Sequence, residues 1–144
     1  MQSKTTNELL KLLNNTHSPI QLEEYRTKYT LDSSALTFSH AFSELLEVHQ
    51  LSKASVIKDS LLDRTYAYQI INGSKKPGRD KIIALGIAAR FSLKEIQHLL
   101  MCSSEGSLYS RSSRDAILIY VIEHELGVLS ANEMLFDSGE ALLE

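Results

Sequence analysis

The stretch Leu51–Asp80, LSKASVIKDSLLDRTYAYQIINGSKKPGRD, decides the fold of this chain. Ser52 is a suitable N-cap for a helix over residues 53–60, because its side chain can accept a hydrogen bond from the first turn. Asp63 is an equally suitable N-cap for a second helix over residues 64–72. The stretch therefore predicts two short helices joined by a tight turn.

Gly73 stands where a helix-terminating glycine is expected, so the second helix should end in front of it. Spacings of three and four residues place Ala67, Ile70 and Ile71 on the inward side of this helix. The polar and aromatic side chains on its other faces are Arg64, Thr65, Tyr68 and Gln69. Side chains of this kind hydrogen-bond the edges of DNA bases in the major groove. We therefore expect the front of this helix to read double-stranded DNA.

Positive charge is concentrated around these two helices, although the 144-residue chain has a formal net charge of −3. Residues 50–81 carry seven basic and three acidic side chains, whereas residues 111–144 carry two basic and seven acidic ones. A phosphate-facing surface needs such a local excess, and chance clustering on a solvated face is the alternative. The acidic C-terminal residues should point away from DNA or contact a protein partner. The side chains expected to neutralise phosphates are Lys53, Lys75, Lys76 and Arg79.

The composition, with 43% hydrophobic and 23% charged residues, is typical of a folded soluble protein. The longest apolar runs, Ile82–Ala89 and Ala116–Ile122, are too short to cross a bilayer. The N-terminal sequence MQSKTTNELLKLL lacks the apolar core and cleavage site of a secretory signal. The single cysteine, Cys102, rules out an internal disulfide and fits a reducing compartment. We therefore expect a cytoplasmic protein without a membrane segment.

Residues 1–36 predict an N-terminal helical extension. A capping-box pattern, T-x-x-E, begins at Thr5 and opens a short leucine-rich helix. Ser18 predicts the start of another helix, because proline follows it at the first helical position and glutamine stands three residues after it. Residues 30–37 are polar and turn-rich, which predicts a joint before the main domain. Apolar residues continue the second helix at Leu22, Tyr25 and Tyr29.

Residues 37–104 predict a main domain of five helices that includes the two short ones. An apolar stripe at spacings of three and four begins at Phe38 and predicts a core helix ending near His49. Residues 80–90 follow the basic loop and are apolar enough for a buried helix. The pattern S-x-x-E at Ser92 predicts a capping box for the next helix, which should end at Cys102.

Residues 105–144 predict a C-terminal helical extension. Ser112 is a suitable cap for a helix in which Ala116–Ile122 is apolar all round, so burial on several sides is expected. The pattern S-x-x-E at Ser130 predicts the last helix, which carries the apolar cluster Met134–Phe136. The chain shows neither strand alternation nor an internal repeat. The predicted fold class is therefore all-α.

Residues 38–101 resemble the Cro and phage-repressor (Xre-type) helix-turn-helix family. The likeness is carried by Leu51-Ser52, Val56, Leu62-Asp63-Arg64-Thr65, Ile70, Asn72-Gly73, Lys76-Pro77, Leu85 and Leu93. This resemblance implies a five-helix, lambda-repressor-like bundle whose third helix enters the major groove. The whole chain is also similar to bacterial regulators that carry helical extensions on both sides of such a bundle.

The resemblance also implies roles for individual side chains. The family usually has glycine in the turn, where this chain has Leu61. A leucine at positive φ costs on the order of 1 kcal/mol, so a turn of different shape is expected. Tyr66 and Tyr68 should add phosphate or thymine-methyl contacts. The implied base contacts are Arg64, Thr65 and Gln69, and the implied phosphate contacts are Lys53, Asn72, Lys76 and Arg79.

One such helix reads only a few base pairs, so useful specificity usually requires a homodimer on a two-fold site. Ala116–Ile122 and Met134–Phe136 are candidates for the dimer interface. For Ala116–Ile122 we favour the alternative, in which it completes the intrachain core. The rival function is a protein-interaction module, antitoxin-like or adaptor, on the same fold. The acidic C-terminal region and exposed tyrosines would suit that role.

No catalytic site, metal site or cofactor is expected from the sequence. Gly73–Gly78 has the glycine spacing of a phosphate loop, but arginine and aspartate follow where lysine and serine or threonine are required. His124 begins a pattern like that of zinc proteases, yet Val128 stands where the second histidine belongs. Cys102 is expected to be a packed or loop thiol rather than a nucleophile. An enzymatic function is therefore not predicted.

Overall fold

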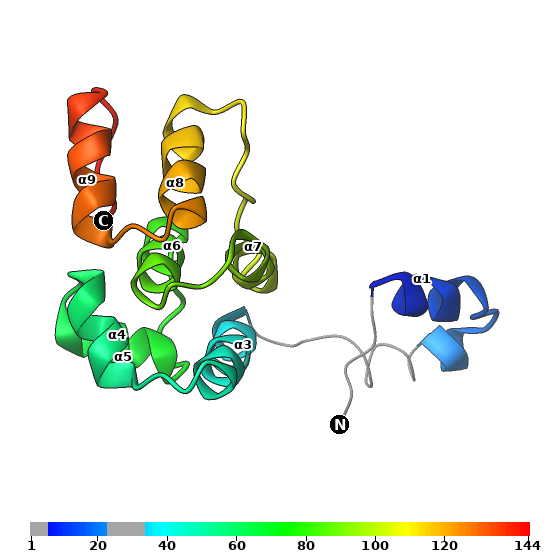
Figure 1. Cartoon of the computed structure of the whole chain (residues 1–144). Coiled ribbons are helices and arrows are strands. Elements are labelled where there is room, and N and C mark those ends of the chain that lie inside the picture. Colours follow the sequence, from blue (N-terminus) through cyan, green and yellow to red (C-terminus); the bar gives the residue numbers. More distant parts are fainter. Residues whose placement is uncertain (1–5, 23–33) are drawn as a thin grey trace. The chain divides into compact units, whose positions relative to one another are not determined.

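The computed structural model describes residues 6–22 and 34–144, in which helices are joined by turns and loops (Figure 1). No strand occurs in these two ranges, and the all-α prediction is confirmed. Contacts within the chain divide it into two units, Met1–Asp32 and Ser33–Glu144. The larger unit contains both the predicted main domain and the predicted C-terminal extension.

The smaller unit contains α1 (Thr6–Asn14) and the start of another helix at Pro19. The predicted start of that helix is confirmed, because Ser18 Oγ accepts a hydrogen bond of 3.1 Å from the Gln21 N–H. No side chain described between residues 7 and 22 is buried. Three residues that the sequence assigns to these helices lie outside the described residues: Thr5, Tyr25 and Tyr29.

The helices of the larger unit are joined by turns and loops, of which the longest connects α7 to α8. They are α3 (Ser34–Val48), α4 (Lys53–Ser60), α5 (Arg64–Ile71), α6 (Arg79–Ala88), α7 (Leu93–Cys102), α8 (Ser113–Glu123) and α9 (Val128–Asp137). The two short helices predicted after Ser52 and Asp63 are confirmed as α4 and α5. The capping box predicted at Ser92 is also confirmed, because the Ser92 and Glu95 side chains each accept the other residue's backbone N–H.

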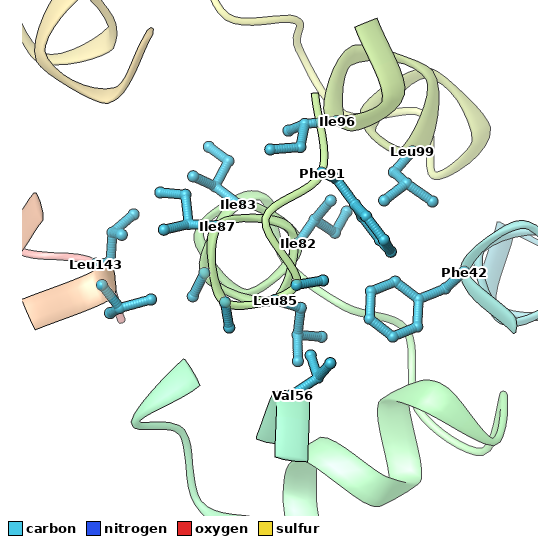
Figure 2. Packing of buried hydrophobic residues seen from close by; sticks show 14 of the residues in the cluster. Phe42, Val56, Ile82, Ile83, Leu85, Ile87, Phe91, Ile96, Leu99 and Leu143 are labelled. Carbon is cyan, nitrogen blue, oxygen red and sulfur yellow. The ribbon is translucent and has the colours of Figure 1, made fainter. Parts of the chain in front are cut away.

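Helix α6 lies at the centre of the hydrophobic core, with all of residues 82–89 buried. Figure 2 shows α6 nearly end-on, with Phe42 of α3, Val56 of α4 and Ile96 of α7 around it. Leu143, from the residues that follow α9, lies on another side. A helix surrounded in this way is held by burial, at about 1.5–3 kcal/mol for each large apolar side chain.

Gly86 allows α6 and α7 to approach closely. A Cβ atom at this position would lie 2.6 Å from Ile96 Cγ1 and 2.9 Å from Ile96 Cδ1. Distances this short are sterically forbidden, so the missing side chain is what permits the contact. The packing of α7 on the central helix therefore depends on a glycine inside α6, despite the cost of glycine to helix stability.

Two ion pairs connect the beginning of α6 to the beginning of α8. Arg79 of α6 pairs with Asp115 of α8, and Asp80 of α6 pairs with Arg114 of α8. Arg114 also donates hydrogen bonds to the backbone carbonyls of Ala141 and Leu142. The tail after α9 is therefore tied to the same point as the two helices.

Two predicted helix starts are wrong. Helix α3 begins at Ser34, inside the segment predicted as a joint, and Thr37 of that segment is buried. Helix α9 begins at Val128, whose side chain is buried, and extended Gly127 is its N-cap. Ser130 therefore lies inside the helix rather than in front of it.

The apolar run Ala116–Ile122 is buried only in part. Leu118 and Val121 are fully buried, whereas Tyr120 is 48% exposed. The helix packs against α7 and α9 and leaves its remaining face outward. The Met134–Phe136 cluster is divided in the same way, because Leu135 is fully buried and Phe136 is 74% exposed.

Candidate nucleic-acid interface

Helices α4 and α5 are capped as their sequence predicts. Ser52 Oγ accepts a hydrogen bond of 3.1 Å from the Ser55 N–H, and Asp63 Oδ2 accepts one of 2.9 Å from the Tyr66 N–H. Each cap satisfies a backbone donor that the helix itself leaves unpaired. These short helices consequently start at fixed residues, which sets the position of the side chains on the first turn of α5.

The turn between the helices has the left-handed conformation that glycine favours, although its residue is Leu61 (φ 62°, ψ 14°). The expectation of a different turn shape is therefore wrong. Ser60 Oγ stabilises the turn by donating to the Ile57 carbonyl (2.6 Å) and accepting from the Leu62 N–H (3.3 Å). The side chain of Leu61 is 59% exposed, so little burial offsets its backbone strain.

Helix α5 presents its polar residues outward, as predicted. Ala67, Ile70 and Ile71 are fully buried. Arg64 and Thr65 are exposed on its first turn, and Tyr68 and Gln69 are half-buried on the second. The Arg64 guanidinium carbon lies 5.8 Å from the centroid of the Tyr68 ring. This arrangement brings the four predicted base-contacting side chains onto one short helix.

The end of α5 holds the basic loop in place. Gly73 has a φ of 84°, and the backbone N–H groups of Ser74 and Lys75 donate to the Gln69 carbonyl at 2.9 and 3.2 Å. Lys75 and Lys76 are exposed, and the following Pro77 is buried. The loop therefore presents two ammonium groups beside the C-terminal end of α5 while its proline anchors it to the core.

Lys53, the first residue of α4, lies beside Asn72, the residue that caps the end of α5. Lys53 Nζ donates a hydrogen bond of 3.3 Å to Asn72 Oδ1, and both residues are exposed. Lysine has further N–H donors, and the asparagine amide keeps its own. Both predicted phosphate contacts thus retain donors for an anion at this shared position.

Arg79 is the predicted phosphate contact that the structure places elsewhere. Its Nε donates to the Gly106 carbonyl and its Nη2 to the Ser107 carbonyl, while both terminal nitrogens also reach Asp115. Four hydrogen bonds within the chain occupy most of the five guanidinium donors. We therefore correct the assignment: Arg79 orders the loop before α8 and is left out of the phosphate-facing set.

Lys81 is a cation that sequence reasoning did not single out. It lies in the first turn of α6, half-buried, with Nζ 5.5 Å from the centroid of the Tyr66 ring. Tyr66 belongs to α5 and is one of the predicted phosphate contacts, so this contact places Lys81 beside that residue. The only sequence signal was a lysine three residues after Gly78, at the edge of an apolar run.

The ion pairs of Arg79 and Asp80 do not change the local charge excess. Without these two residues, 50–81 still holds six basic and two acidic side chains, a net charge of +4. Of the two remaining acidic residues, Asp59 lies near the end of α4. Asp63 is the N-cap of α5, where its side chain accepts a backbone hydrogen bond. The surface around α5 therefore remains suited to a polyanion.

Comparisons with protein-family models, curated proteins and solved structures give no significant match to this chain. In the part of the chain that the structure describes, no helix is both long and apolar enough to cross a membrane. The same described residues contain no group of three or more histidine, cysteine, aspartate or glutamate side chains placed to hold a metal ion.

Proposed function

We propose that this protein binds double-stranded DNA in a sequence-specific manner and regulates transcription. The observation that carries the proposal is the arrangement of α5: a short capped helix with Arg64 and Thr65 exposed on its first turn, followed at its C-terminal end by exposed Lys75 and Lys76. An exposed polar helix of this size fits the major groove, and cations on either side of it fit the phosphates that border the groove.

The base contacts are assigned by chemistry. The Arg64 guanidinium bonds a guanine through O6 and N7, and the Gln69 amide bonds an adenine through N6 and N7. Each such pair contributes about 1–3 kcal/mol of discrimination against the wrong base. Thr65 and Tyr68 contact neighbouring base edges or methyl groups.

The phosphate contacts supply affinity that depends on salt and not on sequence. We assign them to side chains gathered around α5 from α4, the basic loop and α6. These are Lys53, Tyr66, Asn72, Lys75, Lys76 and Lys81. The last of these replaces Arg79, whose guanidinium is engaged with Asp115 and two carbonyls.

On this proposal, α3–α7 correspond to the five-helix bundle of the Cro and phage-repressor (Xre-type) family, and α5 is the helix that enters the groove. The protein acts in the cytoplasm as a homodimer, because one helix reads too few base pairs for a useful operator. The support for this is the order of the helices and the resemblance over residues 38–101. The C-terminal helices α8 and α9 complete the core on the other side of α6.

A second candidate function is a protein-interaction module on the same fold. The observation that favours it is the outer face of α9, where Leu129 is 63% exposed and Phe136 is 74% exposed. Glu133 is exposed between them on the same helix. Exposed apolar side chains beside carboxylates suit contact with a protein better than contact with DNA.

The test is selection of bound fragments from random double-stranded DNA at moderate salt. We expect one motif to be enriched, and Arg64→Ala and Gln69→Ala each to weaken binding to it about tenfold or more. Arg111→Ala is the matched control, because Arg111 is exposed before α8 and its loss removes the same charge. Enrichment of no fragment would favour the protein-interaction module, and unchanged binding by both variants would remove the assignment of base contacts.

A further inference from the structure

A hollow of about 350 Å³ lies between α4 and α5. Four of the residues that line it are aliphatic or aromatic, two are cationic and none is a carboxylate. A lining of this composition favours an apolar group that is carried by an anionic molecule. The lining residues are Ala54, Ile57, Lys58, Leu62, Arg64 and Tyr68.

Two of these residues, Arg64 and Tyr68, also belong to the outward-facing side of α5. They stand one helical turn apart, with the guanidinium carbon 5.8 Å from the ring centroid, within the range of a cation–π contact. The apolar hollow therefore begins beside the guanidinium that we assign to guanine. A group bound in the hollow would lie next to the base that Arg64 reads.

The major groove of DNA offers one apolar group, the C5 methyl of thymine. We propose that α5 reads a thymine adjacent to the guanine bound by Arg64, with the thymine methyl seated in the hollow against Tyr68 and Leu62. This inference rests on the proposed function and adds a base preference to it. The methyl displaces water that has few hydrogen-bond partners on the apolar lining.

The geometry also explains why the preference requires this particular pair of helices. Ile57 is buried and Leu62 half-buried, so the floor of the hollow is fixed by the core. The left-handed residue Leu61 lies in the turn that joins the two helices of the hollow. The hollow exceeds the volume of a methyl group, so the methyl enters without displacing a side chain.

The test uses the DNA fragment selected above, with each thymine replaced in turn by uracil, which lacks only the methyl. We expect one replacement, next to a guanine, to weaken binding about fourfold, which corresponds to about 0.8 kcal/mol. In Tyr68→Ala the same replacement should change binding by less than about 1.5-fold, whereas Tyr68→Phe should keep the dependence. Tyr120→Ala, which removes an exposed tyrosine of α8, is the control and should keep it in full.

Each outcome decides between the two proposals. Specific binding that tolerates every uracil would overturn the thymine inference and leave DNA binding standing. A methyl dependence that persists in Tyr68→Ala would overturn the assignment to this hollow. Enrichment of no fragment would overturn both proposals. If Tyr68→Ala loses its helical circular dichroism, Leu62→Ala replaces it and should reduce the fourfold effect to about twofold.

Discussion

Arg79 and Asp115 are joined by two parallel hydrogen bonds, 3.1 Å from Nη1 to Oδ1 and 2.8 Å from Nη2 to Oδ2. The neighbouring residues Asp80 and Arg114 make the reverse pair, with two bonds of 2.9 Å. Both α6 and α8 therefore have an aspartate in the first turn, where the helix dipole favours negative charge. Each also has an arginine there, which pairs with the aspartate of the other helix. Such bidentate pairs fix the orientation of the two side chains as well as the distance between them.

Loss of the Arg79 guanidinium should destabilise the larger unit. Asp115 is only 6% exposed, so Arg79→Ala leaves a carboxylate without its main partner, and we expect a loss of about 2 kcal/mol in the free energy of unfolding. Urea denaturation followed by circular dichroism measures this change. Lys76→Ala, which removes an exposed cation from the loop before α6, should alter stability by less than about 0.5 kcal/mol. Equal effects of the two variants would contradict the structural role of Arg79.

The stability of the larger unit should fall in acid. Burial alone would raise the pKa of Asp115, but hydrogen bonds from Arg79 and from the Tyr109 N–H outweigh burial and lower this pKa. Burial would also raise the pKa of Glu95, but hydrogen bonds with His49 and Ser92 and the attraction of His49 together outweigh burial and lower this pKa. A carboxylate with a lowered pKa in the folded state stabilises above its unfolded pKa, and this stability is lost as pH falls below about 4.

Asp115→Asn provides the measurement for this pH dependence. The variant should be less stable than the wild type at pH 7 and should lose less free energy of unfolding between pH 5 and pH 3. Urea midpoints collected over this range test the expectation. Wild-type and variant curves that run parallel would show that Asp115 does not contribute to acid sensitivity.

The salt dependence of DNA binding should identify the phosphate contacts. We expect Lys75→Ala, Lys76→Ala and Lys81→Ala each to lower the slope of log K against log salt by about 0.9. Lys94→Ala is the control, because Lys94 is exposed on α7 and belongs to no part of the proposed interface. A slope unchanged in Lys81→Ala but lowered in Lys94→Ala would place the DNA on another face.

Leu61→Gly should stabilise the protein. The substitution removes the strain of a left-handed leucine and adds some chain entropy to the unfolded state, so the expected net gain is about 0.5 kcal/mol. Leu61→Ala is the comparison, because it shortens an exposed side chain but keeps the strain, and it should be close to neutral. Thermal unfolding distinguishes the two. A glycine variant less stable than the alanine variant would contradict the conformation of this turn.

Gly86→Ala should destabilise the core by about 1–3 kcal/mol, since the new Cβ would meet the end of the Ile96 side chain. Ile96→Ala removes the atoms involved at the cost of a cavity. The double variant should therefore lose less stability than the two single losses added together. Additive losses in urea denaturation would show that α6 and α7 separate easily at this point.

Local signals made much of this fold predictable. The caps at Ser52, Asp63 and Ser92 act through neighbouring residues, so their patterns in the sequence are complete. Ser130 shows the limit of such patterns, because the burial of Val128 extends the helix past a residue that would otherwise cap it. Burial depends on partners that are distant in the sequence, and it outweighs a cap worth about 1 kcal/mol.

The candidate site likewise contains residues that the sequence predicts and residues whose role depends on distant segments. The outward residues of α5 follow from its helical period, which needs no knowledge of other segments. The engagement of Arg79 depends on Asp115, 36 residues later, and the proximity of Lys81 to Tyr66 depends on how α6 packs beside α5. Charge alone does not distinguish a cation that faces solvent from one that is held within the chain.

Helix α6 contacts α4, α7 and α9, and its start is paired with the start of α8. One consequence is thermodynamic: because α4, α7 and α9 all pack on α6, the loss of one of them exposes apolar surface of the helix on which the other two also depend. This unit should therefore unfold in one cooperative transition, with the amide hydrogens of α6 exchanging only through global opening. If the protein binds DNA as proposed, a substitution in α8 or α9 would then reduce DNA occupancy through the folded fraction, without altering a side chain assigned to DNA contact.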